Sequence, residues 1–100
     1  MEKIIFSKIK STDQFLFNKA IAVSLVIDSD IVELSTFPYI KFTGKYYINQ
    51  IVKENFICTV YHVSKESSYD ESDNWNLYIS KSKNKVMLYN QKNEGVILKR

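Results

Sequence analysis

Short apolar runs rich in Ile, Val, Tyr and Phe recur along the chain and are separated about every eight to twelve residues by polar clusters. Within several runs apolar and polar side chains alternate, with the period of two that places successive residues on opposite faces of a sheet. The pattern predicts a mainly β fold (α+β is possible): a single domain over residues 1–100, built as an antiparallel meander of six to eight strands. We expect a curved sheet or small barrel with at most one or two short helices.

The beginning of the chain combines one expected strand with one expected helix. Residues 4–9 open with an apolar run and predict a strand. Ser11 is followed three residues later by Gln14, which resembles a capping box, in which each of the two side chains binds the backbone N–H of the other residue. This pair predicts a helix that continues to Ala20.

Residues 20–27 allow two interpretations. Alternating side chains favour a strand that pairs, through a turn at residues 28–30, with a second strand over residues 31–35. The alternative is one helix over residues 13–27, which gathers some apolar side chains on one face but leaves others on its polar side. The alternation favours the strand.

Pro38 ends the second of these strands, because proline has no N–H to donate to a sheet and holds its predecessor in an extended conformation. A hairpin is predicted next, in which residues 39–42 pair through a turn at residues 43–44 with a strand over residues 46–52. A short helix over residues 45–53 is the alternative, since that range also places apolar side chains on one helical face.

Residues 56–63 form the strand that the pattern predicts most clearly, after a turn at residues 53–55. Both faces of this strand are largely apolar, which is typical of a central strand. The chain then continues as a C-terminal meander with strands over residues 75–79, 85–89 and 96–98. Three side chains of this meander are expected to point inward: Trp75, Leu77 and Ile79.

Composition removes most catalytic chemistry. One cysteine and one histidine can form neither an intrachain disulfide nor a zinc site of Cys and His ligands. The two glycines, Gly44 and Gly95, are expected in hairpin turns, so no glycine-rich loop binds phosphate. Cys58 and His62 are the only candidate nucleophile and base, but four residues of a strand span about 13 Å, too far for a hydrogen bond. We therefore expect no enzyme, no metal and no cofactor.

The apolar runs also bear on the cellular compartment. The N-terminal run is three residues long, against roughly 7 to 15 in a secretory signal. The longest apolar stretch, residues 20–27, is far shorter than the roughly 20 residues of a membrane-spanning helix. With an unpaired cysteine, these features predict a protein of the reducing cytoplasm that does not contact a membrane.

Residues 64–74 contain no aliphatic side chain and are expected to form the one long loop. One lysine and four acidic residues give this segment a local charge of −3. It lacks the Asp and Gly spacing of a calcium-binding loop, so a metal site is not expected. An acidic loop can instead dock on a basic protein surface, and its candidate residues are Tyr69, Asp70, Glu71 and Asp73.

The aromatic content of 14% exceeds what a core of this size has to hold, so some rings are expected to face solvent. Tyrosine is enriched at protein interfaces, although rings that merely cover the outer face of a sheet are the ordinary alternative. The tyrosines expected outside are Tyr46, Tyr47, Tyr61, Tyr69, Tyr78 and Tyr89. Among them, the candidate protein-binding residues are Tyr61, Tyr69, Tyr78 and Tyr89.

The C-terminal quarter, residues 75–100, holds six basic residues and one acidic residue, a local charge of +5. Its lysines lie near tyrosines that can stack on unpaired bases. Arginine, which reads guanine, occurs only at position 100, and lysines on exposed turns also keep sheets from pairing edge to edge. The candidate nucleic-acid-binding residues are Lys81, Lys83, Lys85, Lys92, Tyr78 and Tyr89.

These features predict a non-catalytic protein-binding module. We expect a small inhibitor, immunity or anti-defence protein of a bacterium or phage, which blocks another protein, such as a nuclease or toxin, by steric occlusion. The acidic loop and the tyrosines are expected to make the contacts. The alternative is a protein that binds single-stranded nucleic acid or RNA without sequence preference through the basic C-terminal hairpins.

Overall fold

A computed structural model describes residues 3–9, 22–39, 42–66, 75–91 and 95–100. These residues form strands and no helix: β1 Ile4–Phe6, β2 Lys8–Ile9, β3 Ala22–Asp28, β4 Ile31–Phe37, β5 Gly44–Glu54, β6 Cys58–Lys65, β7 Trp75–Ser80, β8 Lys85–Asn90 and β9 Gly95–Lys99. The first two segments are halves of one N-terminal strand, interrupted at Ser7. The expected antiparallel meander is therefore confirmed, with eight strands.

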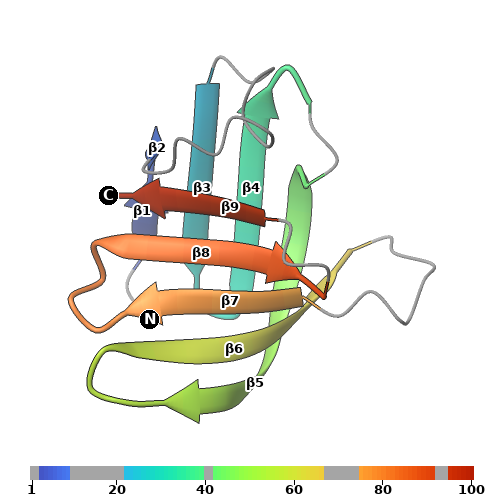
Figure 1. Ribbon diagram of the computed structural model, residues 1–100. Helices are drawn as coiled ribbons and strands as arrows, with labels where there is room; N and C mark the ends of the chain where they lie inside the picture. The colour runs from blue at the N-terminus through green and yellow to red at the C-terminus, as the bar shows by residue number, and fades with distance from the viewer. Residues whose placement is uncertain (1–2, 10–21, 40–41, 67–74, 92–94) are drawn as a thin grey trace.

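The strands close into a barrel. From β3 to β9 each strand pairs antiparallel with the next strand along the chain. β1 pairs with β3 and β2 pairs with β9, so the N-terminal strand connects the two ends of the meander. The result is a nearly closed, barrel-like sheet (Figure 1).

The barrel has two layers, because two of its strands bend. In Figure 1, β3 and β4 run across the direction of β6 to β9, and β5 curves from one group to the other. The register of β5 against β6 shifts between Ile48 and Gln50 and again between Ile51 and Lys53. Such bulges bend a strand and increase its twist. At the opposite corner, the break at Ser7 separates the half that pairs with β3 from the half that pairs with β9.

Alternate side chains of both layers fill the space between them. Tyr46 belongs to this interior: it is fully buried, its hydroxyl donates to the carbonyl oxygen of Phe42 at 2.5 Å, and its ring packs edge-on against Trp75. The expectation that Tyr46 lies outside is wrong, because its pairing with Val32 places both on the inward face. The largest fully buried side chains are Tyr46, Phe6, Leu25, Ile27, Leu34, Leu77, Leu88 and Leu98.

Several local predictions are tested by these strands. Residues 22–28 are a strand, which excludes a single helix over residues 13–27, and β5 replaces the alternative helix over residues 45–53. Phe42 lies in a turn and Gly44 already belongs to β5, so the expected turn at residues 43–44 is wrong. The helix predicted after Ser11 lies outside the described residues.

Gly95 is needed for close strand contact and not for a turn. It is the first residue of β9, where it pairs with Tyr89. A Cβ atom at this position would lie 1.9 Å from the backbone oxygen of Leu88. Gly44 is likewise the first residue of a strand, so the prediction that both glycines lie in turns is wrong.

Candidate functional site

Two hairpin turns lie side by side at one end of the barrel. β6 pairs with β7 so that Cys58 is opposite Ser80, which brings the β5–β6 turn next to the β7–β8 turn. The backbone N–H of Lys81 donates to the carbonyl oxygen of Ile57 at 2.9 Å and joins the two turns directly. Both are visible at the same side of the molecule in Figure 1.

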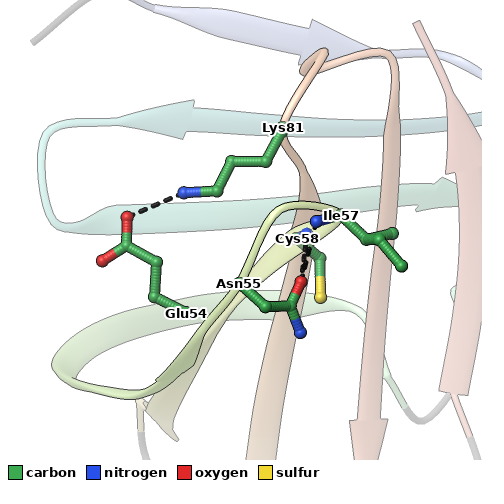
Figure 2. Close-up of polar contacts among 5 residues, drawn as sticks. All are labelled: Glu54, Asn55, Ile57, Cys58 and Lys81. Carbon is green, nitrogen blue, oxygen red and sulfur yellow. Dashed lines mark hydrogen bonds and ion pairs between the residues drawn. The ribbon is translucent and has the colours of Figure 1, made fainter.

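Asn55 determines the shape of the β5–β6 turn. Its side-chain oxygen accepts hydrogen bonds from the backbone N–H groups of Ile57 at 2.8 Å and Cys58 at 2.9 Å (Figure 2). Its own backbone N–H donates to the carbonyl oxygen of Cys58 at 3.0 Å. An Asn side chain that binds the backbone two residues ahead is a common way to stabilise a turn. The turn is therefore ordered by its own hydrogen bonds.

An ion pair between Glu54 and Lys81 connects the β5–β6 turn to the β7–β8 turn. The Lys81 Nζ atom lies 2.7 Å from a carboxylate oxygen of Glu54, the last residue of β5 (Figure 2). Both side chains are substantially exposed, so this pair alone is worth about 0.2–1 kcal/mol. Its effect is to connect the end of β5 to the beginning of the next turn.

This ordered turn exposes large apolar side chains. Phe56 is 100% exposed and Ile57 is 71% exposed, and Ile51 and Val52 of the same hairpin are each more than half exposed. We name these four residues the apolar tip. Burying such a side chain contributes about 1.5–3 kcal/mol to the free energy of folding. The exposed side chains of the apolar tip do not make this contribution. Single exposed apolar residues are ordinary, but a group of them on one structured hairpin indicates a contact surface.

The sequence does not reveal the apolar tip. Residues 56–63 are predicted as one strand, with the preceding turn at residues 53–55, whereas β6 begins at Cys58. The prediction is wrong for Phe56 and Ile57, which lie in the turn, where the N–H of Ile57 binds the Asn55 side chain instead of a neighbouring strand. The only local signal is the turn-forming Asn55 itself, placed before two residues with high strand propensity.

The candidate tyrosines are divided between the two faces of the sheet. Tyr61 pairs with the buried Leu77 and packs against the core from inside the barrel. Tyr78 is the neighbour of Leu77 and points outward, as does Tyr89 next to the buried Leu88. The structure thus does not bring the three rings to one surface. Four further candidates lie outside the described residues: Tyr69, Asp70, Glu71 and Asp73.

The described candidate lysines belong to two adjoining segments. Lys81 and Lys83 are exposed in the β7–β8 turn, whereas Lys85 begins β8. Lys85 is directly opposite Lys99 of β9, which in turn is opposite Lys8 of β2. The result is a row of three lysines across three strands, which sequence spacing does not reveal. Lys92 lies outside the described residues.

Cys58 and His62 form separate contacts on β6. A hydrogen bond between the side chains of Cys58 and Tyr78 is the main cause that raises the pKa of the Tyr78 hydroxyl. His62 Nδ1 lies 3.0 Å from the side-chain nitrogen of Asn49 on β5. In the part of the chain described by the structure, no group of three or more His, Cys, Asp or Glu residues could hold a metal ion. Nor does this part contain a helix of the length and apolar character that crossing a membrane requires.

The fold and the site together define a small, nearly closed β-barrel with an apolar hairpin tip at one end. Comparison of the chain with protein-family models, with curated proteins and with solved structures finds no match. A function must therefore be argued from the site.

Proposed function

We propose that this chain is a non-catalytic protein-binding module that inserts the apolar tip into a partner protein and blocks it by steric occlusion. The observation that carries the proposal is the combination of order and exposure at one turn. Asn55 fixes the backbone, while Phe56 is fully exposed. A turn whose backbone is already ordered loses less conformational entropy on binding, and exposed aromatic residues dominate the binding energy at many interfaces.

The charges near the tip support a partner surface that carries acidic residues. Lys53 is exposed at the end of β5, and Lys83 is exposed in the neighbouring turn. Neither lysine has an ion pair with any residue in the described ranges. The complementary surface is an apolar pocket wide enough for a phenyl ring, with acidic residues beside it. An inhibitor, immunity or anti-defence protein acting in the cytoplasm on a nuclease or toxin fits this proposal.

Photo-cross-linking tests the proposal. A photoreactive phenylalanine analogue at position 56, expressed in the cell of origin, is expected to cross-link one protein in equimolar amount. The same analogue at position 82, in the polar β7–β8 turn, is the matched control and is expected not to cross-link that protein. Equal cross-linking from both positions, or none from position 56, would contradict the proposal. Recovery of lipid adducts alone from position 56 would also contradict it, because the tip would then contact a membrane.

The lysine row favours a second candidate function, the binding of single-stranded nucleic acid. Like charges directly opposite each other destabilise a sheet, so Lys8, Lys99 and Lys85 in one row point to an anionic ligand. The affinity for oligo(dT) should fall steeply with salt, and replacing Lys99 with Gln should reduce the salt slope by about one. Lys53→Gln, on the other hairpin, is the control. Absence of binding at about 50 mM salt would exclude this function.

A further inference from the structure

A cavity of about 630 Å³ lies at the same end of the barrel as the apolar tip. It forms because β5 leaves β4: the two strands pair only as far as Ile31 opposite Tyr47, and one further backbone bond joins the N–H of Ile48 to the carbonyl oxygen of Asp30. Beyond that point the bulged half of β5 pairs with β6 alone. The barrel is therefore open between its layers. The volume of the cavity lies within the range of roughly 300–1,000 Å³ that is typical of small-molecule binding sites.

The inner wall of this cavity is mainly apolar and consists of four isoleucines and the side chain of Tyr61 from β6. Ile4 and Ile27 line it from β1 and β3 and are buried, while Ile48 and Ile79 line it from β5 and β7 and are half-buried. Ile79 shares the inward face with the fully buried Leu77 two residues before it, so its remaining exposure is toward the cavity. Cavities lined in this way bind apolar molecules.

The rim of the cavity carries charges that cancel. Asp30 and Glu54 contribute two carboxylates, and Lys81 and Lys83 contribute two ammonium groups, of which Lys81 and Glu54 form the ion pair at 2.7 Å. A balanced rim does not select an ion of either sign. The hydroxyl group of Thr59, which also lines the cavity, can form a hydrogen bond with an uncharged polar group of a ligand.

We propose that this cavity binds a small, uncharged, mainly apolar molecule with a single hydrogen-bonding group, such as an alcohol. Its apolar body lies against Ile4, Ile27, Ile48 and Ile79, and its hydroxyl group reaches the polar rim. None of the four apolar-tip residues lines this cavity, so the ligand site is distinct from the tip that we propose contacts a partner protein, although Lys83 lies beside both.

Binding of Nile red, an uncharged dye that fluoresces in apolar surroundings, tests the cavity directly. One dye molecule per chain is expected. Ile79→Glu places a carboxylate in the cavity and should weaken dye binding by about tenfold or more, since an ionised group in an apolar site is strongly unfavourable. Ile48→Glu provides the same test from β5 if the first variant does not fold. Circular dichroism and thermal melting establish which variants are folded.

The apolar tip is the other surface to which such a dye can adhere, so a tip variant is the matched control. Replacing both Phe56 and Ile57 with Ser should leave the dye affinity unchanged within about twofold. Loss of dye binding in this tip variant, with retention in Ile79→Glu or Ile48→Glu, would overturn the proposal. Absence of any dye binding to the wild-type chain would overturn it as well.

Competition identifies the ligand class. Decanol, decanoate and decyltrimethylammonium share one apolar chain but differ in head-group charge. Decanol is expected to displace the dye and to raise the melting temperature of the wild-type chain, because a ligand that binds only the folded state stabilises it. Stronger displacement by either ion than by decanol would contradict the uncharged ligand. Since the tip variant keeps its cavity, failure of partner binding and failure of ligand binding are distinguishable.

Discussion

The β5–β6 and β7–β8 turns are built alike but expose opposite kinds of side chain. In the first, the Asn55 side chain accepts two backbone N–H bonds and Phe56 and Ile57 face solvent. In the second, the Ser80 hydroxyl accepts the backbone N–H of Lys85 at 3.2 Å, and every residue from 81 to 84 is polar. The turns are neighbours at the same end of one barrel.

The difference between the two turns indicates whether exposed apolar side chains are required in a turn at this end of the barrel. The β7–β8 turn demonstrates that a polar sequence connects two strands of this barrel at this location. We therefore expect that the exposed ring and aliphatic side chain of the β5–β6 turn are not needed for folding. This expectation supports the proposal that the apolar tip contacts another molecule.

The largest effect is expected from removing the apolar tip. Replacing Phe56 and Ile57 with Ser should weaken binding to the cross-linked partner by about thirtyfold or more, about 2 kcal/mol, which is typical of anchor residues. The free energy of unfolding should change by less than about 0.5 kcal/mol, because both side chains are exposed. Ser82→Ala in the polar turn is the control for both measurements. A large fall in the unfolding midpoint of the tip variant would contradict the expectation that Phe56 and Ile57 are not needed for the fold.

The next effect concerns the asparagine that supports the apolar tip. Asn55→Ala removes the acceptor of two backbone N–H groups and should lower the free energy of unfolding by about 1–2 kcal/mol in urea titrations. Asn84→Ala in the other turn should lower it by less than about 0.5 kcal/mol, since among the described residues the Asn84 side chain accepts only from the hydroxyls of Ser80 and Ser82, and its bond from Arg100 is to the backbone carbonyl. Asn55→Asp, which retains an acceptor oxygen, should restore most of the loss. Equal effects at positions 55 and 84 would contradict the role of Asn55.

A smaller effect is expected at the ion pair between the turns. Glu54→Gln should lower the free energy of unfolding by about 0.2–1 kcal/mol at low salt, and the difference should disappear at about 1 M salt. Glu33→Gln is a suitable control, because Glu33 is exposed and has no ion pair among the described residues. A salt-independent difference would indicate that Glu54 acts through packing.

The smallest effect is expected at the opposite end of the β5–β6 hairpin. The Tyr47 hydroxyl donates to a carboxylate oxygen of Glu66 at 3.1 Å, and this bond raises the pKa of Tyr47. A raised folded-state pKa gives stability that is present below the ordinary tyrosine pKa of about 10 and is lost as the pH rises through the folded-state value. Tyr47→Phe should therefore be less stable than wild type at neutral pH, with the difference vanishing in strong alkali. Glu66→Gln should lower the pKa of Tyr47 in an ultraviolet titration, and partner binding should not change.

The sequence predicts the sheet well wherever alternation is strong. The pattern over residues 75–79 correctly places Trp75 and Leu77 inside, and that over residues 20–27 correctly favours a strand from Ala22 onward. Alternation of apolar and polar residues within one strand indicates which side chains face the core, without knowledge of residues far along the chain. Burial of Tyr46 was not predictable in the same way, because it depends on Trp75, a partner far along the chain.

The candidate site is much less accessible to sequence analysis. Phe56 and Ile57 have strand-forming side chains, yet they lie in a turn that the Asn55 side chain stabilises through the N–H groups of Ile57 and Cys58. The bulge near Val52, which helps to bend β5 and open the cavity, leaves no compositional signal. The expectation that Tyr61 lies outside is wrong, because the pleat of β6 turns it inward against the core.

Amide hydrogen exchange of the free protein tests the central claim most directly, namely that the apolar tip is ordered before it binds. The N–H groups of Ile57 and Cys58, which bind Asn55, and that of Lys81, which binds Ile57, should exchange about tenfold or more slowly than the unfolded chain. The N–H of Phe56, which has no acceptor among the described residues, should exchange rapidly and serves as the internal control. Equally rapid exchange at all four N–H groups would contradict a preorganised tip.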